Sequence, residues 1–258
     1  KSLNILFVII KSILLIVLLL SAIAITFGNK YLVSIKRAQY IEFQSLSLNA
    51  FRNVEAMSLN KIDKSLRFNS NNLSKENPLI SDQIFFEING AKIVGSIDDA
   101  SNCFNINSLV SSNKDDYQEN KKSMNVFREL MYLTEMDNNI VEEIIDQVID
   151  WIDKNTNPRA YGLEDYYYSG PLHNPREYSG GRLLVDIEEL KSIPSVRLVD
   201  WKIFDDLFCA YPFASDLKIN INTLDEKNTL LLASFFPMIN IKDAEYIIEN
   251  IPLDGFQD

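Results

Sequence analysis

The sequence predicts an α+β protein with a long N-terminal helix, a small antiparallel β region and a large helical body. Residues 12–29 are uncharged and mostly apolar, and residues 29–77 contain neither Gly nor Pro, so nothing there breaks a helix. Asn89-Gly90 lies between segments rich in Phe, Ile and Val, which is typical of a β-hairpin. Two copies of Asn-Ile-Asn-Ser/Thr-Leu, at residues 105–109 and 220–224, enclose a stretch with helical periodicity.

The N-terminal element is interpreted as a membrane anchor. The apolar run is about as long as a helix that spans a bilayer. The alternative is a cleaved secretory signal peptide, with Lys11 before the apolar stretch and Ala22-Ile23-Ala24 as the small-residue cleavage site. The lack of helix-breaking residues beyond Asn29 favours a retained anchor that continues into a helical stem.

The body is expected to begin with a hairpin over residues 83–99 and to continue as helices. Each repeat copy is interpreted as a short extended segment that ends at a helix cap, Asn107 or Ser108 in the first copy and Asn222 or Thr223 in the second. Either this strand-to-helix junction recurs by chance, or the copies mark the edges of an insertion. Apolar spacing of three and four residues predicts helices at residues 117–136, 138–152, 185–193, 199–208, 226–236 and 241–250.

The net charge of −11 is unevenly distributed. Up to Arg67 nine basic residues face three acidic ones, whereas the remainder carries 16 basic and 33 acidic residues. Residues 230–256 have the look of a helix-hairpin-helix module, but acidic side chains outnumber basic ones there and would repel phosphate. We therefore expect no nucleic-acid partner, and the acidic body suits a divalent cation.

Several segments occur in an order that resembles one family. They are the apolar helix with its stem, Phe104-Asn-Ile-Asn-Ser-Leu109, Asp150-Trp-Ile-Asp153 followed by Gly162-Leu-Glu-Asp-Tyr-Tyr-Tyr168, Leu184–Leu190, Cys209-Ala-Tyr-Pro212, and the second repeat copy with its helix pair. As an ordered set covering nearly the whole chain, they resemble the K-type minor pseudopilin of bacterial type II secretion (general secretion pathway protein K).

The resemblance implies a pilin-like fold in which a large α-helical domain is inserted into a small sheet. The expected division is a leader remnant and transmembrane helix (1–29), a helical stem (30–77), a first β region (78–112), the inserted domain (113–217), and a return strand with C-terminal helices (218–258).

The resemblance also implies a structural, non-enzymatic role at the tip of the pseudopilus, where the protein would initiate or cap fibre assembly for protein export. The implied partners are other minor pseudopilins, the bacterial inner membrane and prepilin peptidase, with the body in the periplasm. Aligned with the family, peptidase cleavage falls between Ser12 and Ile13, and Ser12 replaces the usual Gly. Val17 then occupies the fifth position, where most pilins carry Glu and K-type members lack it. The alternative is a membrane-anchored periplasmic binding protein or a carboxylate-dependent hydrolase.

The acidic segment at residues 153–165 is a candidate calcium loop. Counted from Asp153, oxygen-bearing side chains fall at positions one, three, five and twelve, as in an EF-hand, but Pro158 stands where an EF-hand requires Gly. Oxygen donors on a loop suit calcium better than zinc. The resemblance implies calcium in the inserted domain as well, with Asn155 where the family usually has Asp. The candidate set is Asp153, Asn155, Arg159, Glu164 and Asp165; the alternative is a solvated loop.

The hydrolase alternative uses the same segment, with its general acid and base among Asp150, Asp153, Glu164 and Asp165. No separate nucleophile, His-containing triad or phosphate loop accompanies these carboxylates, and the one histidine, His173, sits among turn residues. We therefore expect no enzymatic activity.

The two cysteines, Cys103 and Cys209, match no zinc motif. Each precedes one copy of the repeat, so they come close together if the copies run side by side in one sheet. An oxidising periplasm would preserve a disulfide between them. Two buried free thiols are the alternative.

Overall fold

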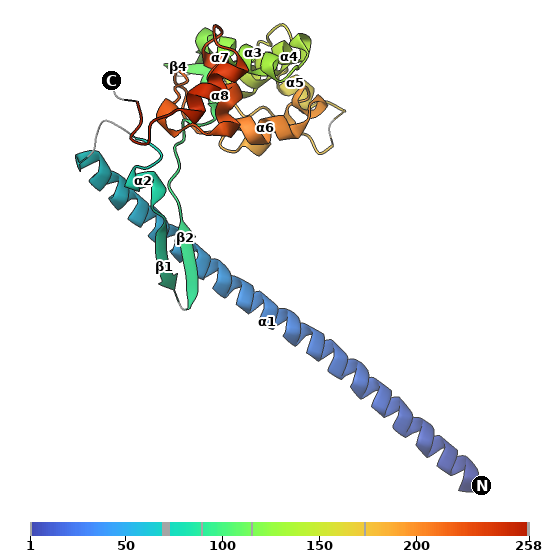
Figure 1. Ribbon diagram of the computed structural model, residues 1–258. Helices are drawn as coiled ribbons and strands as arrows, with labels where there is room; N and C mark the ends of the chain where they lie inside the picture. The colour runs from blue at the N-terminus through green and yellow to red at the C-terminus, as the bar shows by residue number, and fades with distance from the viewer. Residues whose placement is uncertain (1, 69–72, 89, 115, 173, 257–258) are drawn as a thin grey trace. The chain divides into compact units, whose positions relative to one another are not determined.

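The apolar run and the predicted stem form one continuous helix, α1 (Ser2–Phe68) (Figure 1). Its 67 residues correspond to roughly 100 Å at the rise of an α-helix. The apolar side chains between Ile13 and Phe27 are exposed to the surroundings rather than packed. Among the residues that the structure describes, α1 is the one helix long and apolar enough to cross a membrane.

The computed structural model describes residues 2–68, 73–88, 90–114, 116–172 and 174–256. Asn89 of the predicted turn and His173 therefore lie outside the described residues. The chain forms two compact units, the first from residues 1–67 and 83–96, the second from residues 68–82 and 97–258. The predicted inserted domain, residues 113–217, lies within the second unit.

The first unit pairs α1 with the predicted hairpin. Strands β1 (Ile84–Ile88) and β2 (Ala91–Gly95) are antiparallel, with Ile84 opposite Gly95. Gly90 has a φ of +82°, which suits a tight turn. A Cβ on Gly95 would lie 2.9 Å from a methyl group of Val54, so this glycine lets β2 approach α1 closely.

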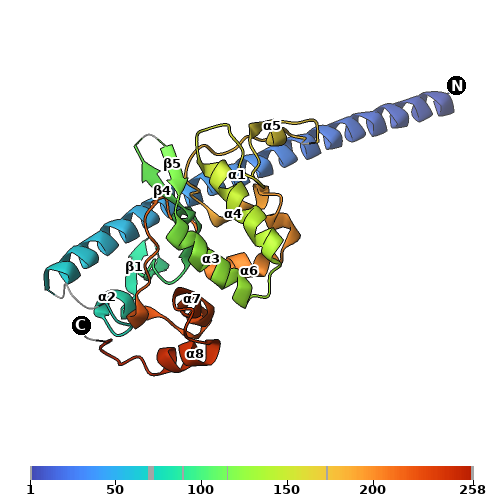
Figure 2. The same ribbon diagram turned by 90° about the horizontal axis from the view of Figure 1, so that it is seen from above.

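The second unit is mainly helical. After the short α2 (Pro78–Ser81), its helices are α3 (Lys121–Leu133), α4 (Asn138–Ile152), α5 (Asp165–Tyr168), α6 (Trp201–Leu207), α7 (Thr229–Phe235) and α8 (Ile241–Glu249). Short 3-10 helices cover Ile106–Leu109, Ile187–Ser192, Val196–Leu198, Ile221–Thr223 and Glu226–Asn228. Helix α7 contacts both α3 and α8, which lie on either side of it (Figure 2).

The main core lies where α3, α4 and α6 meet the first repeat copy. Phe104, Phe127 and Phe208 pack with ring centroids 5.3 to 5.6 Å apart, and Phe204 packs against Phe208. Aliphatic side chains of α3 and α4 complete this core; they include Leu130, Met131, Ile144, Ile145 and Ile149. A smaller cluster under α7 and α8 consists of Leu224, Leu232, Ala233, Ala244 and Ile248.

The described strands form three two-stranded sheets. Besides the hairpin, β3 (Phe104–Asn105) pairs in parallel with β6 (Phe208–Cys209), and β4 (Val110–Asn113) pairs antiparallel with β5 (Asp116–Glu119). The α+β class is confirmed, but the return strand expected from residue 218 is not formed: in the described residues Ile221–Thr223 is a 3-10 helix. The partner of the first repeat copy is the segment at Phe208, not the second copy.

The repeat has a common local structure. Asn105 and Asn220 each accept a hydrogen bond from the backbone N–H two residues later and so cap the 3-10 helix that follows. The Asn105 amide also exchanges two hydrogen bonds with the backbone of Tyr211, at 3.0 and 3.2 Å. Asn107 does the same with Leu184, at 2.9 and 2.8 Å. Each side-chain amide thereby makes the pair of hydrogen bonds that a peptide group of a neighbouring strand would make.

Candidate metal centre

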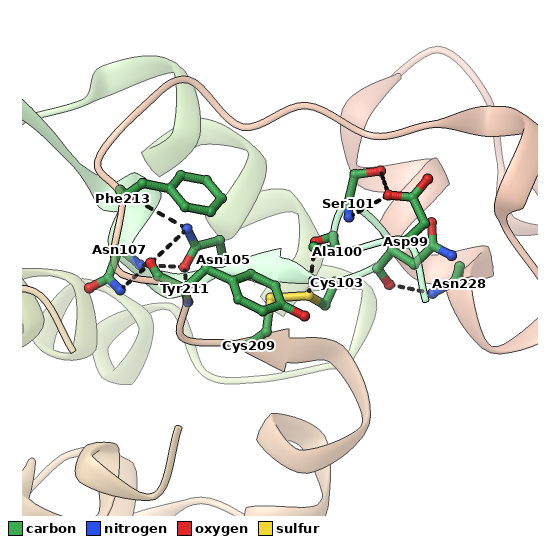
Figure 3. Close-up of a disulfide and its surroundings, with 11 residues drawn as sticks. Asp99, Ala100, Ser101, Cys103, Asn105, Asn107, Cys209, Tyr211, Phe213 and Asn228 are labelled. Atoms are coloured by element: carbon green, nitrogen blue, oxygen red, sulfur yellow. Dashed lines mark hydrogen bonds between the residues drawn. A yellow bond between two sulfur atoms is a disulfide. The ribbon is translucent and has the colours of Figure 1, made fainter. Parts of the chain in front are cut away.

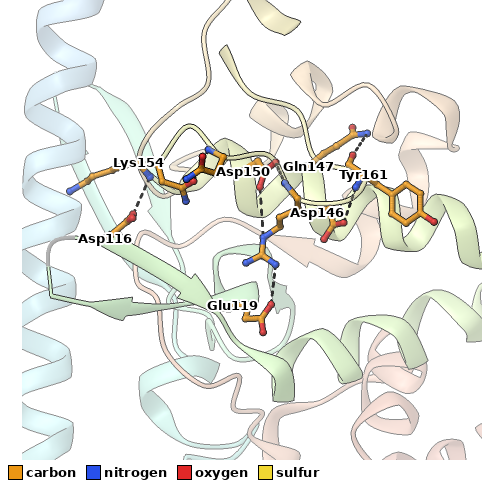
Figure 4. Close-up of polar contacts among 10 residues, drawn as sticks. Asp116, Glu119, Asp146, Gln147, Asp150, Lys154 and Tyr161 are labelled. Atoms are coloured by element: carbon orange, nitrogen blue, oxygen red, sulfur yellow. Dashed lines mark hydrogen bonds and ion pairs between the residues drawn. The ribbon is translucent and has the colours of Figure 1, made fainter. Parts of the chain in front are cut away.

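The acidic loop folds back along the last turns of α4. The backbone N–H of Arg159 donates to Asp150 Oδ2 at 3.0 Å, and that of Tyr161 donates to Asp146 Oδ2 at 3.1 Å (Figure 4). Gln147 Nε2 donates to the Tyr161 carbonyl at 3.4 Å. These bonds hold the loop against α4. Glu164 is the residue just before α5.

Gly162 is required by the path of this loop. A Cβ at residue 162 would lie 1.7 Å from Asp150 Oδ2 and 2.9 Å from the Arg159 nitrogen. Any side chain there would push the loop away from the carboxylate. The glycine therefore allows the backbone to enclose Asp150.

Three carboxylates are buried together beneath the loop; we call Asp150, Asp153 and Glu164 the acid cluster. Their exposed fractions are 0%, 5% and 2%. Among the described residues, Oδ1 of Asp150, Oδ1 of Asp153 and Oε1 of Glu164 have no hydrogen-bond partner. Buried polar atoms without partners are costly, and buried charges normally pair or coordinate metals.

The acid cluster is also electrostatically strained. Burial raises the pKa of Asp150 and of Asp153 to about 6 and that of Glu164 to about 7. For Asp153 and Glu164 the second cause is the charge of Asp150, which raises the pKa of both. The folded chain thus holds negative charge without enough positive charge beside it.

Arg159 does not have the metal-ligand role that was predicted for it. Its guanidinium points to Glu119, with an Nη1 to Oε2 distance of 2.9 Å, and its Nε lies 3.7 Å from Asp150 Oδ1. Arg159 lowers the pKa of Glu119, chiefly through their hydrogen bond. A cation cannot ligate a metal ion, so this side chain is a neighbour of the acid cluster and not a ligand.

The other predicted residues divide into two groups. Asp153 and Glu164 belong to the acid cluster. Asn155 is exposed and accepts a hydrogen bond from the Asn157 N–H at 2.8 Å, although its side chain also lowers the pKa of Asp153. Asp165 is exposed, and its Oδ1 accepts hydrogen bonds from the N–H and hydroxyl of Ser179, both at 2.7 Å.

Asp150 was absent from the predicted calcium set and appeared only among the possible hydrolase carboxylates. Its position three residues before Asp153, near the end of a helix, would have indicated a shared face.

The donor set can be compared with what calcium requires. Carboxylate oxygens are the ligands that calcium prefers, and three buried ones are available. Within the described part of the chain, no group of three or more His, Cys, Asp and Glu side chains already has the arrangement of a metal centre. The fit therefore rests on the unpartnered oxygens and their uncompensated charge, and ion binding would require these side chains to turn toward a shared point.

A disulfide joins the two cysteines beside the first repeat copy (Figure 3). Cys103 and Cys209 are bonded with their Cα atoms 5.8 Å apart, beside the parallel pair in which Asn105 lies opposite Cys209. Asn105 continues this contact by binding the backbone of Tyr211. The bond thus joins segments 106 residues apart at the start and end of the region that contains α3, α4 and the acid cluster.

The fold is supported by a solved structure. The chain superposes with a TM-score of 0.67 on a chain of the GspK-GspI-GspJ complex from the type 2 secretion system of enterotoxigenic Escherichia coli, with 24% identity, covering 86% of this chain and 75% of that one. A long N-terminal helix, small sheets and several further helices, together with this superposition, define an α+β, pilin-like fold.

The sequence comparisons find similarity to one family. Residues 102–213 match the family model of type II secretion system protein K. Type II secretion system protein K of Aeromonas hydrophila is 28% identical over 180 residues (67% of this chain, 54% of the relative), and that of Pectobacterium carotovorum is 30% identical over 174 residues (66% and 52%). Over this region the chain is similar to the type II secretion system protein K family. The matched region spans about half the length of these relatives.

Proposed function

We propose that the protein is a minor pseudopilin of a type II secretion system and sits at the tip of the pseudopilus, where it initiates or caps fibre assembly. The observation that carries this proposal is the combination of one long helix, apolar in its N-terminal part, with a mainly helical second unit. A fibre subunit needs such a helix for lateral packing, whereas a bulky body leaves little room for another subunit above it.

The anchor of the proposed subunit is the N-terminal part of α1, in the bacterial inner membrane, with the body in the periplasm. Prepilin peptidase would act between Ser12 and Ile13, so that Val17 becomes the fifth residue. Val17 has no carboxylate to pair with the N-terminal amine of a neighbouring subunit. Its apolar side chain supports a place at the end of the fibre, where one neighbour is missing.

The proposed partners are other minor pseudopilins. The similar E. coli chain comes from a complex named for three components, GspK, GspI and GspJ. We expect the full-length protein, purified in detergent, to form a stoichiometric complex with the I-type and J-type minor pseudopilins encoded with it. The major pseudopilin of the same system is the matched control. A protein that stays monomeric with all minor partners, or that binds the major subunit equally well, would refute the tip assignment.

We also propose that calcium is a structural component of the inserted domain. Asp150, Asp153 and Glu164 would hold the ion, with Asn155 and Asp165 at its edge. Calcium there would supply the positive charge that the acid cluster lacks and fix the loop against α4. A ligand that binds only the folded state adds about 2.7 kcal/mol to the free energy of unfolding at a hundredfold excess over its Kd.

The calcium proposal predicts a higher melting temperature in calcium than in metal-depleted buffer. Asp153→Asn and Glu164→Gln keep the size of the side chain and remove one charge, so each should abolish most of this gain. Asp137→Asn is the matched control, because Asp137 caps α4 at its opposite end. Equal melting temperatures with and without calcium in the unmodified protein would end the proposal.

A further inference from the structure

Arg159 is a basic side chain at the edge of the acid cluster, between Asp150 and Glu119. Its guanidinium is held at one side by Glu119 at 2.9 Å and lies 3.7 Å from Asp150 at the other. About a quarter of the side chain, 26%, is exposed. Its Nε is buried and, among the described residues, has no hydrogen-bond partner, like the Asp150 Oδ1 that it faces. The contact with Asp150 is thus electrostatic and longer than a hydrogen bond.

Other charges surround this contact. Asp146 faces Asp150, Asp116 faces Asp153 and Asp165 faces Glu164, and each raises the pKa of the carboxyl beside it. Lys121 lies 3.6 Å from Glu119, on the exposed side. Arg159 is the cation that lowers the pKa of both Asp150 and Asp153. It is therefore the main positive charge acting on the acid cluster.

We propose that Arg159 is the resident counter-cation of the acid cluster: it holds the carboxylates together in the ion-free chain and restricts the site to ions of low charge. This inference rests on the proposed calcium site. A bound ion is repelled by the guanidinium in proportion to the charge of the ion, so a trivalent ion loses more affinity than a divalent one. Arg159 thus lowers the affinity of the site for every cation, and it favours divalent over trivalent ions.

The test compares calcium with terbium in the full-length, metal-depleted protein in detergent. Terbium is a trivalent oxygen-seeking ion, and Trp151 and Tyr168, with ring centroids 5.0 Å apart beside the acid cluster, can sensitise its luminescence. Calcium affinity is then measured by competition against bound terbium. Melting temperatures in ion-free buffer test whether Arg159 holds the carboxylates together in the ion-free chain.

Arg159→Gln removes the charge and retains a polar side chain of similar shape. We expect a lower ion-free melting temperature, about tenfold tighter calcium binding, and a larger gain for terbium, about thirtyfold. Arg159→Lys is the matched control, because it keeps the charge and should keep the unmodified terbium-to-calcium ratio. A variant that folds only when calcium is present also meets the expectation.

The contrary outcomes separate the two proposals. If neither ion binds the unmodified protein, the calcium site itself is refuted. If both ions bind but Arg159→Gln leaves their ratio unchanged, or weakens both equally, Arg159 only shapes the loop and the counter-cation role is wrong. Failure of Arg159→Gln to fold even in saturating calcium also assigns Arg159 a purely structural role.

Discussion

At the scale of single residues, burial of the acid cluster depends on the path of the loop more than on the residues themselves. Spacing in the sequence was enough to select Asp153 and Glu164, because both follow the ligand positions of a calcium loop. It was not enough to include Asp150 or to place Arg159. Those positions depend on the loop returning to α4 and on Gly162 approaching Asp150, and neither contact is encoded by spacing along the chain.

The raised pKa values of the acid cluster predict an unusual dependence on pH. The folded-state pKa values, about 6, 6 and 7, exceed the ordinary values of 3.8 and 4.5, so between these limits the folded state binds more protons than the unfolded state. The contribution of these three groups to stability is then highest below the ordinary pKa values and is lost as the pH rises through the folded ones. We expect the metal-depleted protein to lose about 1–3 kcal/mol between pH 5 and pH 8.

Thermal or urea unfolding in metal-depleted buffer at both pH values measures this loss. Glu164→Gln removes the group with the highest pKa of the three and should flatten the profile, whereas Asp137→Asn should not. Saturating calcium should reverse the trend, because it binds the ionised carboxylates. A metal-depleted protein that is more stable at pH 8 than at pH 5 would contradict the uncompensated charge described above.

At the scale of elements, the sequence predicted helices better than strands. Helix α4 has the predicted bounds, since Asp137 caps its start and the apolar spacing is unbroken to Ile152. The predicted start of α3 at Tyr117 was wrong, because Tyr117 lies in β5 and the cap that begins α3 is Asn120. Short strands such as β3 and β6 carry too few residues to show alternation, and their pairing is fixed by contacts distant in sequence.

The asparagine contacts of the first repeat copy give a prediction at this scale. Asn107 is fully buried, and its amide binds the backbone of Leu184 and the carbonyl of Tyr211 at 2.7 Å. Asn107→Ala leaves these backbone groups unpaired and should lower the free energy of unfolding by about 3 kcal/mol. Asn113→Ala is the control, since Asn113 is exposed and its side chain bonds Gln118 only at the surface; it should cost under about 0.5 kcal/mol. Equal losses in urea unfolding would contradict this.

At the scale of the whole molecule, one covalent bond joins the beginning and the end of the region that contains the acid cluster. The strands that it accompanies contribute two residues each, so their hydrogen bonds alone hold this junction weakly. The chain-entropy model assigns about 4–5 kcal/mol to closing a loop of this length. The stability of the region between Cys103 and Cys209 therefore depends on their redox state.

We expect reductant to lower the melting temperature of the unmodified protein and to leave that of the Cys103→Ser/Cys209→Ser variant unchanged. Thiol titration of the denatured, unreduced protein should detect no free thiol. Two thiols per chain would show that the bond is absent in the purified protein, and a melting temperature insensitive to reductant would show that it contributes little.

The separation of 106 residues between the cysteines also bears on the order of folding. Helices α3 and α4 are neighbours in the chain and in space, so their contacts close short loops and form early. The pairing of β3 with β6 must wait until the chain between them has collapsed. The two thiols meet only then, so oxidation fixes a topology that the helices have already selected. Oxidation before the strands pair would close the loop around a chain that has not yet collapsed, so the timing of oxidation affects the folding pathway.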